Sequence, residues 1–522
     1  MDNDINELED IRKNIVDWYP FEKDKKVLDL SNRKYITDLL RKKCCVVTES
    51  EKNEKYDYIV FVGNIGEGAE KIKNSLKHLD DDGKLLLAAN NGLSIKSLCV
   101  DYDDTNLSKN EIDHFLSKNG LEFKKTYYVY PSIEAANVLY TDKFTINPEN
   151  ISRNIFLYEN DEIAMQNENT LIKKFLKKDK SVISLFSNAF FFECSKKSFI
   201  DNEIYFVSYT NMRKTPYRVK TIIQGKYAVK TAWSEKSQTH IQQIEKNIDY
   251  MNLMGIETVD KYEDSAIKSK IMYSETVDQI VINKFENNQP EEARNIVKKF
   301  SENLFEKLTN PGHVDKNVFD KYDIEYATED IENLHFAKYG LWDLIFQNAF
   351  LIDDKIIFFD QEWYEENVPV EFILYRSYKY TTKISKYISL EEFYSLLNVN
   401  SNMVKIFEQL DSILQDNVRS EIIWKLHSNH KSYSNIIDNA NRKNEELSNN
   451  INIITEDFKK LLNEKDARIR FLEDNIQNNC QLIQEREIQL AQIQGSRSWK
   501  LTKPLRKLEK FLKKGKNNEN KR

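Results

Sequence analysis

The sequence YDYIVFVGNIGEG (56–68) begins with a seven-residue run, Tyr56 to Val62, in which only Asp57 is charged. An apolar run of this length without alternation is typical of a strand that is covered on both faces, as in a parallel sheet. Similar runs and intervening helical stretches surround it: KVLDL (26–30), CCVVT (44–48), AEKIKNSLKHL (69–79) and KLLLAA (84–89). Strands that alternate with helices predict βαβ units, and therefore a doubly wound α/β sheet over residues 1–145.

The composition favours a helix-rich intracellular protein. At roughly 100–200 residues per domain, 522 residues predict two to four domains. Only 12 glycines and 8 prolines are present, which disfavours an all-β architecture with many tight turns. The five cysteines form no CxxC pair, so we expect a reducing, cytoplasmic location and no zinc site or disulfide framework. The acidic start MDNDINELED predicts no signal peptide, and no apolar run approaches the ~18 residues of a membrane span.

The pattern changes several times along the chain. The stretch YRVKTIIQGKYAVKTA (217–232) predicts a hairpin that turns near Gln224 and Gly225, and Pro290 begins a later amphipathic helix. Strands therefore precede helices in this part, unlike the alternation before it. We expect five segments: an α/β domain at 1–145, a connecting segment at 146–204, a mixed domain at 205–430, a coiled coil at 432–494 and a basic tail at 495–522.

Residues 432–494 carry apolar side chains at coiled-coil spacing. The series Leu447, Ile451, Ile454, Phe458, Leu461 resumes, after an eleven-residue step from Phe458, with Ile469, Leu472, Ile476, Ile483, Leu490, Ile493. Asn479 and Arg486 occupy core-type positions and weaken the seam. The spacing predicts a homo-oligomer of unspecified strand number. The alternative is a single solvated helix, which is poorly stable at this length without a partner.

The tail places apolar residues on one face of a predicted helix and basic residues on the other. Its apolar positions are Trp499, Leu501, Leu505, Leu508, Phe511 and Leu512. From Arg497 onward there are 11 basic and 2 acidic residues, so the rest of the chain is strongly acidic. This pattern predicts an interfacial helix on an anionic membrane surface. A solvated or RNA-attracting tail is the alternative, although the acidic body argues against a nucleic-acid-binding protein.

A set of residues suited to phosphoryl transfer lies between 205 and 385. Lys230 ends the apolar stretch YAVK, where it could hold phosphates, and Glu245 on the next helix is its expected partner, with Glu235 as the alternative. Asp343 precedes Asn348 by five positions, and Asp360 follows the apolar strand KIIFF (355–359). The opposing interpretation is that Asp343 and Asn348 only cap a buried turn and that Asp360 pairs with a surface charge.

This part of the chain resembles the kinase-like fold, especially its small-molecule phosphotransferase branch. The resemblance rests on WDLIFQNAFLIDDKIIFFDQEW (342–363) and VPVEFILYRSY (368–378) and implies an α+β bilobal domain. It further implies that Asp343 is the catalytic base, that Asn348 and Asp360 bind Mg²⁺, and that Lys230 binds ATP. No glycine-rich loop precedes Lys230. The basic residues available to replace that loop are Arg213, Lys214 and Arg218.

Residues 20–145 resemble class I S-adenosylmethionine-dependent methyltransferases, in particular a group found with bacterial cell-surface polysaccharide enzymes. The likeness rests on KVLDLSN, VVTES, YDYIVFVGNIGEG, DDDGKLLLAANNGLSIKSL and FKKTYYVYPSIEAANVLYTDK. Glu49 stands where the family's acidic residue holds the ribose of the cofactor. The first strand, however, ends in DLSNR (29–33) without glycine, and there is no room for a third strand before residue 56. The resemblance therefore implies a degenerate domain that binds S-adenosylmethionine poorly.

The order of the segments resembles the membrane-associated methyltransferase–kinase proteins that terminate O-antigen chains, and SRSWKLTKPLR (496–506) resembles a tail of polysaccharide glycosyltransferases. We therefore expect a Mg-ATP-dependent phosphotransferase at the inner face of the cell membrane, acting on a glycan or lipid-linked sugar. One alternative is a non-catalytic scaffold that recruits glycosyltransferases. The other is an active methyltransferase.

Overall fold

The structure is a computed structural model that describes residues 10–99, 105–144, 165–179, 181–310, 316–397, 402–421, 423 and 433–510. The chain forms two compact units, Met1–Asn435 and Ile436–Arg522. The first unit is mixed α/β and contains a 12-stranded sheet and a separate three-stranded sheet. The expected α/β fold is therefore confirmed in its coarse form, a mixed α/β unit followed by a unit with a long helix.

Four parallel strands lie at one end of the large sheet, in the spatial order β2-β1-β3-β4. They coincide with the four predicted strands: β1 (Lys26–Asp29), β2 (Val46–Thr48), β3 (Tyr56–Val62) and β4 (Leu79–Asn90). Helices α3 (Lys34–Lys43) and α4 (Ile65–Ser75) connect them. The sequence prediction of a strand–helix alternation is confirmed for this region.

The two faces of this sheet are both buried, as continuous apolar strands require. Alternate residues of β3 fall into different hydrophobic clusters: Tyr58 and Val60 on one face, Ile59 and Phe61 on the other. The first face is covered by α2 (Asn14–Asp17) and α3, and the second by α4, α6 (Lys109–Lys118) and α8 (Glu168–Lys178).

The segment expected to connect two domains instead supplies a central strand. Strand β7 (Ala189–Ser195) is antiparallel to β4 on one side and to β5 (Phe123–Tyr130) on the other. All seven residues of β7 are buried, and β6 (Val138–Tyr140) continues the sheet beyond β5. The sequence around Phe190–Phe192 is apolar enough for this position, but its pairing with β4, about 100 residues earlier, is a long-range contact.

The same sheet continues into residues 204–270. Strand β8 (Ile204–Tyr209) pairs with β6, and β9 (Val219–Gln224), β10 (Tyr227–Ala232), β13 (Ala266–Lys270) and β12 (Asp260–Glu263) follow in that spatial order. The predicted hairpin is β9–β10, and Gly225 takes φ +56° at its turn, a backbone conformation that favours glycine. Helix α10 (Gln238–Leu253) packs on this end through Ile241, Ile244 and Ile248.

Helices and a small sheet complete the first unit. The sheet has the order β11-β15-β14, formed by β11 (Glu257–Thr258), β14 (Ala349–Ile352) and β15 (Lys355–Phe358). The main helices are α11 (Val277–Glu286), α12 (Pro290–Leu308), α15 (Val370–Tyr380), α16 (Leu390–Leu397) and α17 (Asn402–Val418). Pro290 is the first residue of α12, as predicted.

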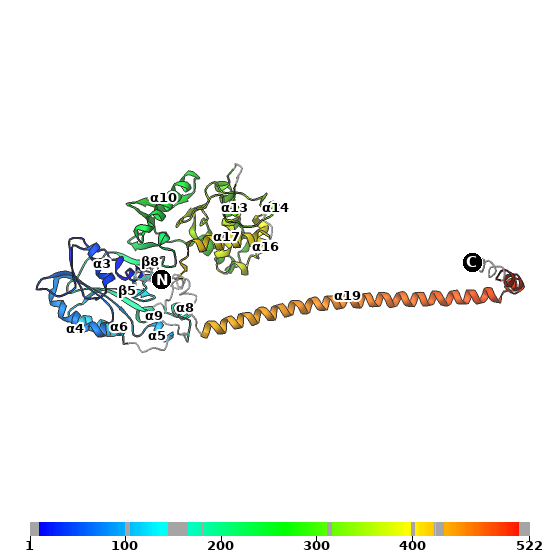
Figure 1. The fold of residues 1–522 in the computed structure, drawn as a ribbon, viewed down its shortest axis with the longest axis horizontal. Coiled ribbons are helices and arrows are strands. Elements are labelled where there is room, and N and C mark those ends of the chain that lie inside the picture. The colour runs from blue at the N-terminus through cyan, green and yellow to red at the C-terminus, as the bar shows by residue number, and fades with distance from the viewer. Residues whose placement is uncertain are drawn as a thin grey trace, which may run out of the picture. The chain divides into compact units, whose positions relative to one another are not determined.

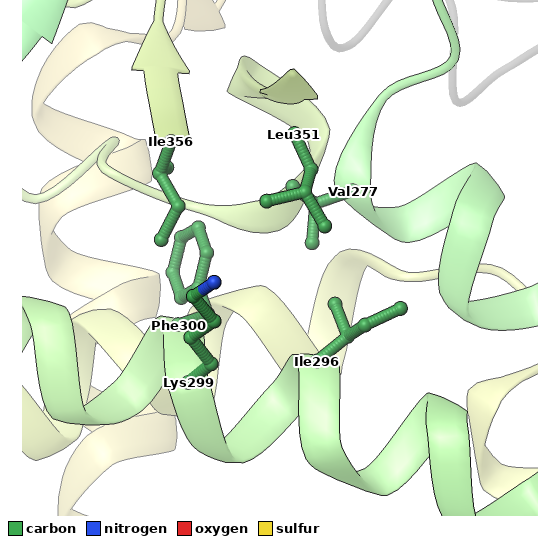
Figure 2. Close-up of a pocket in the computed structure, with 6 residues that line it drawn as sticks. All are labelled: Val277, Ile296, Lys299, Phe300, Leu351 and Ile356. Carbon is green, nitrogen blue, oxygen red and sulfur yellow. The ribbon is translucent and has the colours of Figure 1, made fainter. Parts of the chain in front are cut away.

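Helix α12 packs against the β14–β15 hairpin over a small apolar recess (Figure 2). Its lining residues are Val277, Ile296, Lys299, Phe300, Leu351 and Ile356. The recess encloses about 10 Å³, which is the space of a single water molecule. It is therefore a packing feature of the helical core and offers no room for a ligand.

The second unit is dominated by one uninterrupted helix, α19 (Tyr433–Gly495), which spans the segment predicted as a coiled coil (Figure 1). Its apolar side chains are exposed: Leu447, Ile451, Phe458, Leu472 and Ile476 each show about half or more of their surface. A short helix α20 (Arg497–Leu501) follows, while Phe511 and Leu512 of the predicted tail face lie outside the described residues. In the described part of the chain, no helix combines the length and apolarity needed to cross a bilayer.

Candidate functional site

Lys230 lies between two carboxylates at the junction of the large sheet and the helical part. Its ammonium group bonds to Asp360 and to Glu362, which both follow strand β15. Burial opposes protonation of Lys230, but the two carboxylates more than offset it and raise its pKa above the ordinary value. The lysine of β10 and the aspartate after β15, which the sequence placed in one site, do meet in the structure.

Glu362 is the most heavily paired carboxylate of this site. Its side chain is 3% exposed, bonds to Arg213 as well as Lys230, and lies 3.4 Å from His240 Nε2. Burial alone would raise the pKa of Glu362, but these three neighbours hold it well below its usual range. Trp363 packs against two of these neighbours. Its ring centre lies 4.8 Å from that of His240 and 4.9 Å from the Arg213 guanidinium.

The partner of Lys230 is therefore not the one expected. The prediction named Glu245 on α10, with Glu235 as the alternative. The structure places Glu245 half-buried on α10 and Glu235 exposed at the start of the short helix η3 (Glu235–Ser237), and the carboxylates bonded to Lys230 come from the segment after β15. The residue on α10 that bonds to Glu362 is His240, five positions before Glu245.

Asp360 sits at a strained point of the backbone, with φ +62°. A left-handed conformation at a non-glycine residue persists only where the surroundings hold it. Here the Asp360 amide donates to Asp260 Oδ2 at 2.7 Å, and Ser269 Oγ donates to the other oxygen of Asp260 at 2.6 Å. The Asp360 side chain remains 46% exposed, so its carboxylate is accessible from solvent although it pairs with Lys230.

Asp343 lies in the turn before β14 and is paired with a buried arginine. Arg376 Nη2 donates to Asp343 Oδ1 at 2.9 Å, and the same guanidinium bonds to Asp411. Burial raises the pKa of Asp343, Arg376 lowers it, and Asp360 and Glu362 raise it further, so the net direction is upward. Gln361, which stands between Asp360 and Glu362, donates from Nε2 to the Asp343 carbonyl at 3.0 Å, so the Asp343 turn contacts the segment that carries the other two carboxylates.

Asn348 and Gln361 link the Asp343 turn to the segment after β15 that contains Asp360. Asn348 Nδ2 donates to the Asp343 carbonyl at 3.1 Å, and Gln361 Nε2 donates to the same oxygen at 3.0 Å. The backbone carbonyl of Asn348 accepts from the amide of Phe359 at 3.0 Å. Because the amide nitrogen of Asn348 is engaged, its Oδ1 is left as an acceptor, which is the atom that a hard cation would use.

Arg213 comes from the connection between β8 and β9, the place where sequence analysis looked for a substitute for a glycine-rich loop. Of the three basic residues considered there, Arg213 reaches Glu362. Arg218 is buried and donates from Nε to the Arg213 carbonyl at 2.7 Å, and Lys214 Nζ donates to the Asp416 carbonyl at 3.2 Å. Arg213 is thus the one of the three that enters the cluster around Lys230.

Sequence reasoning missed Glu362, Asp260 and Arg376. Glu362 had a weak signal, since it is a second carboxylate only two positions after Asp360 in DQEW. Arg376 lies within the stretch VPVEFILYRSY, where a charged residue among apolar ones suggests a buried pair. Asp260 had none, because it joins the site through the backbone of Asp360.

Glu49, the expected ribose-binding residue, lies in the parallel part of the large sheet. It follows β2, is exposed and pairs with Arg41 of α3 at 2.7 Å. The strand order reverses between β1 and β3, which makes this place the topological switch point of the sheet. In α/β sheets, ligands usually bind at such a point, at the carboxyl ends of the strands. Polar groups there bond to one another: the Val62 amide donates to Ser31 Oγ at 3.1 Å, and Lys71 Nζ donates to the Leu30 carbonyl at 3.0 Å.

Within the described ranges, no three His, Cys, Asp or Glu side chains gather as a potential metal-ligand set. The sequence matches no known protein family, and a comparison with curated proteins finds no relative.

Proposed function

We propose that this protein is a Mg-ATP-dependent phosphotransferase whose site is the Lys230 cluster. The observation that carries the proposal is the bond between Lys230 and Asp360, 130 positions apart, next to a segment that is hydrogen-bonded to the Asp343 turn through Gln361. A cation for phosphate groups, an exposed carboxylate for a metal and a second carboxylate for a proton are the groups that phosphoryl transfer requires.

The residues present fit Mg²⁺ bound together with a nucleotide. Magnesium in such sites takes one or two protein oxygen ligands and completes its shell with phosphate oxygens and water. Asp360 offers a half-exposed carboxylate and Asn348 an amide oxygen, and both lie at the open end of the β14–β15 hairpin. The bound metal would neutralise phosphate charge. Lys230 would leave its carboxylates in part to contact the phosphates.

We assign to Asp343 the role of accepting the proton of an acceptor hydroxyl. In the transfer, the acceptor oxygen forms a bond to the terminal phosphorus of ATP, the bond to the ADP oxygen breaks, and the hydroxyl proton passes to the Asp343 carboxylate. Arg376 holds Oδ1 of Asp343 and orients the carboxylate. The acceptor we propose is a hydroxyl of a glycan or lipid-linked sugar. This choice rests on the resemblance of the sequence to polysaccharide-associated methyltransferase–kinase proteins.

The first half of the chain is proposed to be structural. At the point where the strand order reverses, polar groups of β1 and its neighbours are hydrogen-bonded to one another, and Glu49 forms an ion pair with Arg41. Both features disfavour binding of S-adenosylmethionine. The sheet that this half shares with β8, β9 and β10 gives it a mechanical role, because it supports the strand that carries Lys230.

The exposed apolar side chains of α19 support self-association through a coiled coil, since a helix of this kind buries them only against a partner. Beyond it, Leu501, Leu505 and Leu508 are each more than 60% exposed among basic residues, which supports reversible attachment to an anionic membrane. We place the protein at the cytoplasmic face of the cell membrane, where glycosyltransferases are possible partners.

Thermal unfolding of the full chain with and without Mg-ATP tests the enzymatic proposal. Wild type is expected to gain stability with Mg-ATP and not with ATP in EDTA, and Lys230→Ala and Asp360→Ala should each abolish the gain. Lys298→Ala, an exposed substitution on α12, is the control and should respond like wild type. If wild type shows no Mg-ATP-dependent shift, the phosphotransferase proposal fails.

A scaffold without catalysis is the second candidate. It is favoured by the complete pairing of Lys230, whose ammonium is already held by two carboxylates. The same experiment separates the two candidates, because a scaffold predicts no nucleotide-dependent stabilisation.

A further inference from the structure

A large polar cleft lies between the first half of the sheet and the end of β10, and its lining includes neither Lys230 nor the two carboxylates bonded to Lys230. It encloses about 710 Å³, within the range of small-molecule sites. Its walls come from three places: the segment around α2, helix α3, and the turns η2 (Thr215–Tyr217) and η3. The lining residues are Asp10, Lys13, Asn14, Asp17, Leu39, Lys42, Thr215, Trp233, Ser234, Glu235 and Lys236.

One wall of the cleft is rigidly built. Asn14 is fully buried, and its Oδ1 accepts from Trp233 Nε1 at 2.7 Å. Its Nδ2 donates to the Ala136 carbonyl at 3.2 Å and to Asn211 Oδ1 at 2.9 Å. The hydrogen bond to Asn14 therefore fixes the position of the Trp233 indole. The Arg218 guanidinium lies 5.0 Å from the centre of the Trp233 ring.

The carboxylates on the α2 side are already neutralised. Asp17 forms ion pairs with Lys220 at 2.8 Å and Lys43 at 3.3 Å, and Asp10 pairs with Lys13 at 2.5 Å. Burial would raise the pKa of Asp17, but the two lysines lower it below its ordinary value, so Asp17 stays ionised and occupied.

Two lysines on different walls are left over. Lys42 of α3 and Lys236 of η3 are exposed and have no ion-pair partner within the described residues. The cleft is lined by three lysines and three carboxylates, but Asp17 is paired with Lys43 and Lys220 behind the wall and Asp10 with Lys13. Lys42 and Lys236 therefore face one remaining carboxylate, Glu235, and two cations on a concave surface attract anions.

We propose that this cleft binds a small anionic, hydroxyl-bearing ligand of the sugar-phosphate class. Lys42 and Lys236 would take the anionic group by charge-assisted hydrogen bonds. Thr215, Ser234 and Glu235 offer oxygen atoms to ligand hydroxyls, and Leu39 and Trp233 supply the apolar part of the lining. The predominance of polar side chains favours a hydroxylated ligand over a flat aromatic one, which needs apolar faces on both sides.

Calorimetric titration of the full chain tests the site with glucose 6-phosphate, glucuronate, inorganic phosphate and glucose as probes. Wild type is expected to bind glucose 6-phosphate, and glucose weakly or not at all. The glucuronate and inorganic phosphate titrations show whether a carboxylate or phosphate alone suffices. Lys42→Ala and Lys236→Ala should each lower the affinity about tenfold, the usual scale of one charge-assisted contact.

Two controls keep this site separate from the proposed phosphotransferase site. Lys298→Ala removes an exposed lysine elsewhere and should leave the titration unchanged. Lys230→Ala should keep glucose 6-phosphate binding while it loses any response to Mg-ATP. The proposal is overturned if wild type binds none of the anionic probes at millimolar concentration, if Lys42→Ala and Lys236→Ala bind like wild type, or if Lys230→Ala abolishes the binding.

Discussion

Glu362 and Lys230, 132 positions apart in the sequence, form an ion pair in which the carboxylate is almost completely buried. The same carboxylate bonds to Arg213 and approaches His240. A single glutamate after β15 therefore holds together a strand, a loop and a helix around the lysine of the candidate site.

Replacement of Glu362 by glutamine should disturb both stability and nucleotide binding. The buried cations Lys230 and Arg213 would lose a charged partner, and breaking a buried pair in this way costs about 3–5 kcal/mol. We expect a lower denaturant midpoint and at least a tenfold weaker Mg-ATP affinity. Glu245→Gln on α10 is the matched control and should change the unfolding free energy by less than ~0.5 kcal/mol. Equal effects of the two substitutions on Mg-ATP affinity would contradict the assignment.

Stability should depend on pH through Glu362. Its pKa is lowered in the folded protein, so its contribution is present above the ordinary value of 4.5 and is lost as the pH falls through the lowered pKa. Denaturant titrations from pH 6 down to pH 2.5 should therefore show a decline in unfolding free energy that is shallower in Glu362→Gln. Parallel curves for wild type and variant would rule out this role.

The pH dependence of phosphoryl transfer should report Asp343. Its pKa is raised above 3.8 by burial and by Asp360 and Glu362, with Arg376 acting in the opposite direction. A base must be deprotonated, so the rate should fall as the pH drops through this raised pKa. Arg376→Gln should move the acid limb of the ATP-turnover profile to higher pH. An acid limb that stays in place in this variant would remove Asp343 from the proposed role.

Self-association should depend on the apolar seam of α19. Leu472→Asp places a charge at a core position and should shift the full chain toward monomer in sedimentation equilibrium. Gln477→Asp, at a predicted outer position of the same helix, introduces the same charge and should leave the association unchanged. A wild-type chain that is monomeric at every concentration would end the coiled-coil proposal.

Removal of residues 495–522 should release the protein from vesicles that contain anionic lipid. At about 1 kcal/mol for each basic residue near the surface, loss of several contacts corresponds to at least a hundredfold weaker partitioning. Leu505→Glu and Leu508→Glu should weaken binding without changing the basic residues, since both leucines are exposed in the structure. Vesicle co-sedimentation that is unaffected by the truncation would refute the anchor.

Much of the fold was predictable because its signals are local. The run from Tyr56 to Val62 became β3 residue for residue, and the hairpin at Gly225 formed where expected. Strand β7 was not predicted, because it forms by pairing with β4 and β5, and both of these strands lie far away in the sequence. For the same reason, the sequence did not indicate that strands β1–β7 and strands β8–β13 without β11 belong to one sheet.

Local sequence patterns were sufficient to predict strands β1 to β4, the β9–β10 hairpin and the long helix α19, and to single out Lys230, Asp343, Asn348 and Asp360 as candidate site residues. Those features depend on apolar periodicity and turn residues within a few positions. The pairing of Lys230 with Glu362 rather than Glu245, and of Asp343 with Arg376, became visible only in the folded chain. Pairing between buried charges depends on which side chains the packed core brings within reach, and no local pattern records that distance.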